Sequence, residues 1–256
     1  MPNPNTFLNL RRWNIVMFCL HAVQAVAVLV LSNSFAVPLT TAFLSFNTQN
    51  FTLQQNLQEL TTVSVGPLVA GFFALSALAH LMVSLPGIYE WYVNHLKKGA
   101  NYARWVEYSL SSSLMIVVIG MLVGIYDVFS LLLMFGLNAM MILFGWMMEL
   151  HNQSTKKTDW TAYIFGCIAG AIPWIVIACY LAFSGDADHH APTFVYWIFF
   201  SMFLFFNSFA VNMLLQYKKI GKWKEYTYGE KVYIILSLVA KSLLAWQVFA
   251  GTLRPV

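Results

Sequence analysis

Two ionisable side chains lie in the middle of otherwise apolar segments of the sequence. Lys241 is at the centre of the apolar run 232–251, about 15 Å from either end of a helix that rises about 1.5 Å per residue. A charge at that depth of a membrane costs roughly 2.5–3.5 kcal/mol, so it indicates a functional site. Glu107 lies well inside another such segment, whereas the other nine acids fall in expected loops or at segment ends. Two unit charges about 4 Å apart attract by about 4 kcal/mol at an effective dielectric constant of about 20, so we expect Lys241 and Glu107 to face each other.

This pair has a chemistry of its own. The amine of a lysine desolvated in an apolar pocket is a usable nucleophile toward an aldehyde, and the product is an imine. A protonated imine needs a counter-anion, which Glu107 can supply. One mid-membrane lysine on the last helix and one carboxylate on the third therefore indicate an apoprotein that binds retinal. The alternative is a structural Lys–Glu pair in a transporter or scaffold.

Further polar side chains are expected at a similar depth. Ser76 and His80 are four residues apart and so share a helix face. Counted from the ends of their segments, four groups lie about 8–13 Å from the same membrane face: Glu107, His80, Ser237 and His21. A lone histidine in a membrane helix is more often a hydrogen-bonded packing residue, but the convergence predicts a polar, hydrated cavity.

The elements that must position these groups are long apolar segments. Of the 256 residues 59% are hydrophobic and 9% charged, which indicates an all-α membrane protein. Seven segments approach or exceed the roughly 20 residues that span a bilayer: 12–32, 66–86, 102–124, 127–149, 161–183, 193–216 and 231–251. They predict one seven-helix domain over residues 1–256. The apolar run 13–31 exceeds the about 7–15 residues of a cleaved signal, so we expect it to be the first helix.

The basic residues and the first loop predict how the bundle is oriented. Twelve of the fourteen lysines and arginines fall on one side when seven helices are threaded from the N-terminus. The positive-inside rule then places the N-terminus in the cytoplasm and the C-terminus outside the cell membrane. Loop 33–65 has no lysine or arginine, and Val37, Leu39 and Thr41 alternate with small residues. We expect an extracellular β-hairpin there.

Four stretches resemble the heliorhodopsins, light-absorbing retinal proteins with an inverted membrane orientation relative to other microbial rhodopsins. They are 105–113 (WVEYSLSSS), 138–146 (NAMMILFGW), 205–210 (FFNSFA) and 237–242 (SLVAKS). The resemblance runs from the first helix to the C-terminus. It implies a bundle of the rhodopsin type and a homodimer in the lipid bilayer, with the first outer loop as a β-hairpin.

The resemblance also implies a cofactor and a site. Retinal, all-trans in the dark, would form a protonated Schiff base with Lys241, with Glu107 as counterion and Ser237 beside it. Further candidates around retinal are Tyr108, Ser76, Met115, Asn138, Met141 and Phe206, and those of the polar cavity are His21, His80 and Arg104. The group that accepts the Schiff-base proton stays open between Glu107, His21 and His80, because the three would titrate as a coupled set.

Departures from the pattern of pumping rhodopsins bear on the function. Those proteins usually carry an acid where this chain has Val118, and another where it has Ser237. Without acids toward the outer side, a proton has no obvious exit relay, so we expect a slow light sensor rather than an outward pump. The alternative is a light-gated proton or ion channel or transporter. A cytoplasmic signalling partner could dock on 218–224, although such a basic segment is more typical of a lipid-headgroup anchor.

Several other features point to no further chemistry. No nucleotide-binding loop, catalytic triad or metal-ligand spacing is visible, so we expect neither an enzyme nor a metal site, and no binding of nucleic acid. The three cysteines, Cys19, Cys167 and Cys179, are expected to be small core residues without disulfides. Arg104 and Glu149, both near the inner boundary, form a candidate ion pair.

Overall fold

The structure, a computed structural model, describes residues 4–183 and 190–254. Its helices are α1 (Pro4–Leu31), α2 (Val65–Met82), α3 (Ile88–Lys97), α4 (Tyr102–Leu122), α5 (Val128–His151), α6 (Thr161–Phe183), α7 (Thr193–Tyr217) and α8 (Tyr226–Val248). A 3₁₀ turn, η1 (Gly221–Lys224), precedes α8, and a π-helical turn, η2 (Phe249–Leu253), follows it. Two strands, β1 (Ala36–Asn47) and β2 (Thr52–Ser64), lie between α1 and α2.

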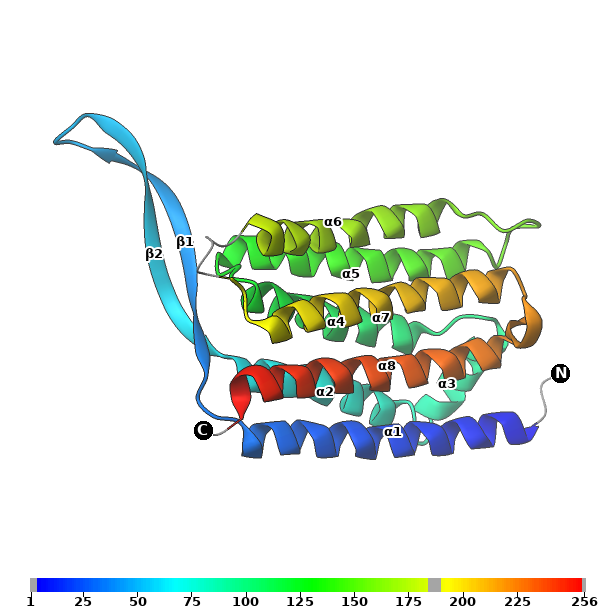
Figure 1. The fold of residues 1–256 in the computed structure, drawn as a ribbon. Coiled ribbons are helices and arrows are strands. Elements are labelled where there is room, and N and C mark those ends of the chain that lie inside the picture. The colour runs from blue at the N-terminus through cyan, green and yellow to red at the C-terminus, as the bar shows by residue number, and fades with distance from the viewer. Residues whose placement is uncertain (1–3, 184–189, 255–256) are drawn as a thin grey trace.

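Seven helices in the described ranges are long and apolar enough to cross a membrane, namely all of the eight except α3. They lie side by side along one direction and alternate in sense along the chain (Figure 1). Many large apolar side chains face outward from these helices, as expected where lipid replaces water around the bundle. The predicted seven-helix membrane bundle is therefore confirmed.

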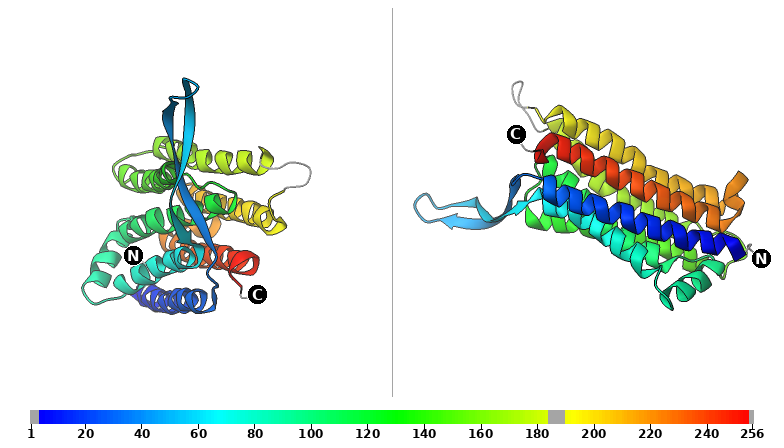
Figure 2. Two further views of the ribbon diagram at one scale, coloured as in Figure 1. Left: turned by 90° about the vertical axis from the view of Figure 1, so that its left-hand side faces the viewer. Right: turned by 90° about the horizontal axis from the view of Figure 1, so that it is seen from below.

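The bundle has two unlike ends. We call the end where α1 starts the basic end; it carries α3, the α5–α6 loop and η1. We call the opposite end, from which β1 and β2 project, the hairpin end; the C-terminus lies there as well (Figures 1 and 2). Polar side chains concentrate in the half near the basic end, whereas the half near the hairpin end holds the largest apolar core, including Phe72, Phe73 and Ile116.

The expected β-hairpin is present in the loop between α1 and α2. β1 and β2 pair antiparallel from Ala36↔Ser64 to Asn47↔Thr52, with an irregularity between Leu39 and Thr40. The base of the hairpin is tied to the bundle, because the backbone N–H of Thr40 donates to the carbonyl of Tyr126 at 2.9 Å. Beyond that point the hairpin extends away from the helices (Figure 2).

One helix was not expected from the sequence. α3 lies in the segment between the second and third predicted spans, and it buries Tyr92, Val93 and Leu96 against the bundle. Its ten residues mix charged with apolar side chains, so their hydropathy does not distinguish this helix from a loop. The last helix also starts earlier than the apolar run at 231 suggests, because α8 begins at Tyr226.

The expectation that the cysteines pack in the core is wrong. Cys19, Cys167 and Cys179 are free and exposed on their helices. Inside a membrane the surroundings of the bundle are as apolar as its core, so hydropathy alone does not drive a small apolar residue inward.

Candidate functional site

The two mid-membrane charges meet as an ion pair inside the bundle. Lys241 on α8 and Glu107 on α4 are both more than nine-tenths buried, and Lys241 Nζ lies 3.2 Å from Glu107 Oε1. The same Nζ donates to Ser237 Oγ, one turn earlier on α8, at 2.7 Å. Ser76 Oγ on α2 donates to Glu107 Oε1 at 2.6 Å. Three helices thus supply partners for two charges that neither lipid nor an apolar core would tolerate alone.

The two histidines lie beside this pair. The rings of His21 on α1 and His80 on α2 stack, with centroids 5.6 Å apart and planes at 9°. His80 Nδ1 is 2.7 Å from Asn14 Oδ1, whereas neither ring nitrogen of His21 has a hydrogen-bond partner among the described residues. An unpartnered buried polar group is costly, so packing alone does not account for a histidine at this position.

A small polar cavity lies next to these groups. It has a volume of about 40 Å³ and is lined by His80, Glu107, Arg104, Glu230 and Asn14, among others. A void of that size with polar walls has room for at least one water. It joins the Lys241–Glu107 pair to a second buried charge cluster nearer the basic end. His21 stands behind His80 and is not part of its lining.

The second cluster is centred on Arg104. Its guanidinium bonds to Glu149 on α5, with Nη2 to Oε1 at 2.6 Å, and also to Glu230 on α8. The expected Arg104–Glu149 pair is therefore confirmed. Glu149 lies in the last turn of α5 and Glu230 in the second turn of α8, near the helix ends as the sequence predicts. Both are nearly fully buried, because the guanidinium and other donors compensate their charge. The sequence does not show that these two acids are buried between helices instead of facing solvent.

Local structure places Arg104 at this position. Asn101 is the N-cap of α4, and its side-chain oxygen accepts from the backbone N–H of Arg104 at 3.1 Å, a standard way to begin a helix. The amide nitrogen of Asn101 donates to Glu230 at 2.5 Å. The guanidinium also lies over the ring of Trp105, with its central carbon 4.2 Å from the ring centroid.

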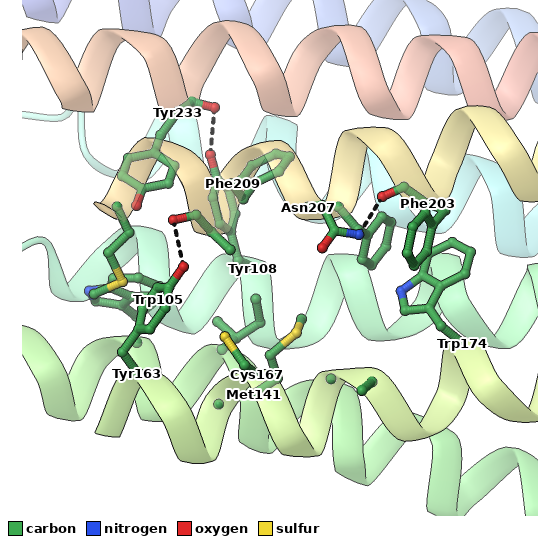
Figure 3. A pocket seen from close by; sticks show the side chains of 18 residues that line it. Trp105, Tyr108, Met141, Tyr163, Cys167, Trp174, Phe203, Asn207, Phe209 and Tyr233 are labelled. Carbon is green, nitrogen blue, oxygen red and sulfur yellow. Dashed lines mark hydrogen bonds between the residues drawn. The ribbon is translucent and has the colours of Figure 1, made fainter. Parts of the chain in front are cut away.

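A large apolar cavity begins on the other side of Lys241. A narrow part of about 40 Å³ is lined by Lys241, Ser237, Met115 and Phe206, among others. It adjoins a cavity of about 250 Å³ between α4, α5, α6, α7 and α8, since five residues line both: Tyr108, Met141, Ile142, Phe206 and Phe209. Trp105 and Tyr163 lie toward one end of the larger cavity, and Trp174 and Phe203 toward the other (Figure 3).

Glycines shape this cavity where helices approach closely. A Cβ on Gly145 of α5 would lie 2.5 Å from the ring of Trp105, and one on Gly170 of α6 would lie 2.2 Å from Met141 Sδ. No Cβ can come so close to another atom. The ring of Trp105 and the thioether of Met141 therefore occupy space that is free only because these two residues are glycines. An elongated apolar cavity with a primary amine at one side and a carboxylate beside it fits a long apolar aldehyde that condenses with lysine.

The other expected retinal-site residues divide into two groups. Tyr108, Met115, Met141, Phe206 and Ser237 line the cavities that adjoin Lys241, and Lys241 Nζ lies 5.2 Å from the ring centroid of Tyr108. Ser76 reaches the site through Glu107. Asn138 is buried but is not part of the lining, because its amide donates to the hydroxyls of two serines on α4 at 2.8 and 3.1 Å.

Comparison with known proteins identifies the family. The family model named heliorhodopsin matches residues 10–253. The chain belongs to the heliorhodopsin family. Among solved structures, seven chains are similar to this heliorhodopsin. One is the crystal structure of a light-driven proton pump, LR (Mac), from Leptosphaeria maculans, with a TM-score of 0.65 and 13% identity over 98% of this chain and 97% of that chain. At that identity the likeness shows the fold alone. No curated protein matches the sequence.

The family and the fold together support a retinal photoreceptor in the membrane. Three features of this heliorhodopsin's site were not singled out from the sequence: the second partner of Arg104, Glu230, the ring of Trp105 between Glu149 and the cavity, and the glycines of α5 and α6. No pattern in the sequence relates Glu230 to Arg104, because their contact depends on how α4 and α8 pack.

Proposed function

We propose that this heliorhodopsin is a light sensor whose retinal, all-trans in the dark, is joined to Lys241 as a protonated Schiff base with Glu107 as counterion. The buried pair of Lys241 Nζ and Glu107 Oε1 at 3.2 Å, at the edge of an apolar cavity, carries the proposal. When bound, retinal supplies the absorption of light and a change of shape on isomerisation. The protein supplies the counter-charge, the shape of the cavity and the surrounding donors.

The side chains around the pair have distinct proposed roles. Ser237 holds Lys241 Nζ from the preceding turn, and Ser76 orients the carboxylate of Glu107 by donating to it. His21, His80 and Glu107 remain the candidates that take up a proton from Nζ. His80 and Glu107 line the same small cavity, and the ring of His21 stacks on that of His80, so proton uptake there is a property of the set rather than of one residue.

Sensing is favoured over outward pumping by two missing acids and by the apolar half of the bundle near the hairpin end. The two positions where pumping rhodopsins usually carry acids hold Val118 and Ser237, both nearly fully buried. The core beyond Lys241 is filled by Phe72, Phe73 and Ile116, which offer no group to relay a proton. The same apolar packing argues against the light-gated channel or transporter, because an ion would need a polar lining across that half.

The proposal extends to topology and assembly. Residues 1–256 act as one seven-helix domain, with the basic end in the cytoplasm and the hairpin end outside. A homodimer is supported by the apolar side chains that the hairpin leaves exposed, among them Phe46, Phe51 and Leu57. A cytoplasmic signalling partner would bind at the basic end. We propose no enzymatic activity.

The test is an absorption spectrum of membranes supplied with all-trans retinal. The unchanged protein and Lys231→Ala should show a visible band, whereas Lys241→Ala should not, because Lys231 is a lysine of the same helix outside the cavities. Glu107→Gln should move the band to longer wavelength, since the negative charge beside Nζ is removed. The absence of a visible band in the unchanged protein would return the Lys241–Glu107 pair to a structural or transport role.

A further inference from the structure

A separate polar cavity opens at the basic end, away from the retinal site. It has a volume of about 360 Å³ and lies between the α3–α4 turn, the α5–α6 loop, the end of α7 and the start of α8. Its lining includes five lysines: Lys98, Lys156, Lys157, Lys219 and Lys224. Segments far apart in the sequence thus bring five positive charges around one hollow.

The carboxylate in this lining does not neutralise the lysines. Glu149 lies at the inner wall, and each of its oxygens already accepts two donors: Arg104 Nη2 and the Tyr226 hydroxyl on Oε1, and the Asn101 N–H and Trp105 Nε1 on Oε2. In the described ranges, no ion pair within 4 Å joins any of the five lysines to an acid. The lining of the cavity therefore carries a net positive charge, which favours the binding of an anion.

One of these lysines is held in an unfavourable backbone conformation. After the last turn of α7, the N–H of Ile220 donates to the carbonyl of Leu215 and that of Lys219 to Gln216, at 3.1 and 3.2 Å. These two hydrogen bonds are those of a Schellman motif at a helix C-terminus. The residue after the C-cap in this motif is usually glycine, because its backbone adopts the left-handed conformation. Here it is Lys219, with φ 52°. Strained non-glycine residues cluster at functional sites, and this one lies in the cavity lining.

We propose that this cavity binds a phosphate-bearing anion. Lysine heads are compact point charges that suit phosphate oxygens, and Gln153 and Thr158 in the lining add polar donors. The volume falls in the range of small-ligand pockets, about 300–1,000 Å³. Since the cavity lies at the end of the membrane helices, the phosphate could belong to a lipid headgroup or to a soluble molecule. The site does not depend on retinal or on the proposed light-sensing function.

The test is calorimetric titration of the full, detergent-solubilised protein with inorganic pyrophosphate. The unchanged protein should show saturable binding that weakens with added salt, because exposed charges are screened. Lys219→Gly should bind about three- to fivefold more weakly, the scale of one exposed ion pair, without a lower unfolding temperature, since glycine accepts this backbone conformation. Removing Lys156 and Lys157 as well should weaken binding more than about tenfold.

The matched control is Lys218→Gln, which changes an exposed neighbouring lysine outside the cavity lining and should leave binding unchanged. No saturable binding to the unchanged protein, or an equal loss in Lys218→Gln and Lys219→Gly, would overturn the proposal. Titration in nanodiscs then distinguishes the two sources. If an anionic lipid abolishes pyrophosphate binding that a zwitterionic lipid allows, the occupant is a lipid phosphate. If binding persists in both, the occupant is a soluble phosphate.

Discussion

Lys241 and Arg104 show two different ways of keeping a cation inside a membrane bundle. Lys241 has one carboxylate and one hydroxyl as partners, an arrangement that leaves its amine facing a cavity. Arg104 has two carboxylates and lies over two aromatic rings, those of Trp105 and Tyr233. The first arrangement suits a lysine that must react, and the second suits a permanent structural charge.

The Arg104 cluster predicts an asymmetric response to neutral substitutions. Arg104→Met should lower the free energy of unfolding by about 3–5 kcal/mol, because two buried carboxylates lose their shared cation. Glu230→Gln should cost about 1 kcal/mol, since the Arg104–Glu149 pair remains and an amide still accepts hydrogen bonds. Thermal unfolding of the solubilised protein measures both. Equal losses in the two variants would show that the guanidinium does not hold the cluster together.

Among the elements, α4 and α5 connect the large apolar cavity to the basic end. Trp105 on α4 lines the apolar cavity, and its indole N–H donates to Glu149 on α5 at 2.6 Å. The ring rests directly on Gly145 of α5. A shift of the cavity wall therefore reaches, through one side chain, a carboxylate that also belongs to the wall of the lysine-lined cavity.

A glycine substitution tests this connection. Gly145→Ala should displace the ring of Trp105, which its Cβ would meet at 2.5 Å, and lower the free energy of unfolding by about 1–3 kcal/mol. The visible band of the retinal-loaded protein should shift as well. Gly136→Ala, on the same helix with nothing within 4 Å of its Cβ, should instead stabilise the protein by up to about 1 kcal/mol. Unfolding and absorption measurements on both variants decide whether the contact matters.

At the scale of the whole molecule, the two halves of the bundle differ in kind. The half near the basic end holds the buried charges, the histidines and two polar cavities. The other half is an apolar core that ends in the hairpin. Such an arrangement suits a signal delivered at the basic end, and the basic loops suit a cytoplasmic location for that end.

The orientation predicts which end a reagent outside the cell can reach. With Cys19, Cys167 and Cys179 replaced by alanine, a single cysteine is placed by Asn50→Cys at the hairpin turn or by Ser154→Cys in the α5–α6 loop. A membrane-impermeant maleimide on intact cells should label the first variant and should label the second only after lysis. Labelling of Ser154→Cys in intact cells would reverse the proposed topology.

The bundle and the central pair can be predicted from the sequence alone. Seven apolar runs are long enough that only membrane helices satisfy their backbone groups. Lys241 and Glu107 had to meet because neither charge is tolerable alone in that environment. The alternation in 36–43 indicated the strands because the period of two is local.

Which residues from different helices share a site depends on how the helices pack. Arg104 lies 45 residues from Glu149 and 126 from Glu230, and nothing local in the sequence states that α4, α5 and α8 bring them together. The sequence also does not determine which face of each helix is buried: lipid and core are both apolar, so hydropathy does not show that the cysteines are exposed. The shapes of the cavities depend on where Gly145 lets Trp105 lie, which is a matter of packing between helices and not of sequence pattern.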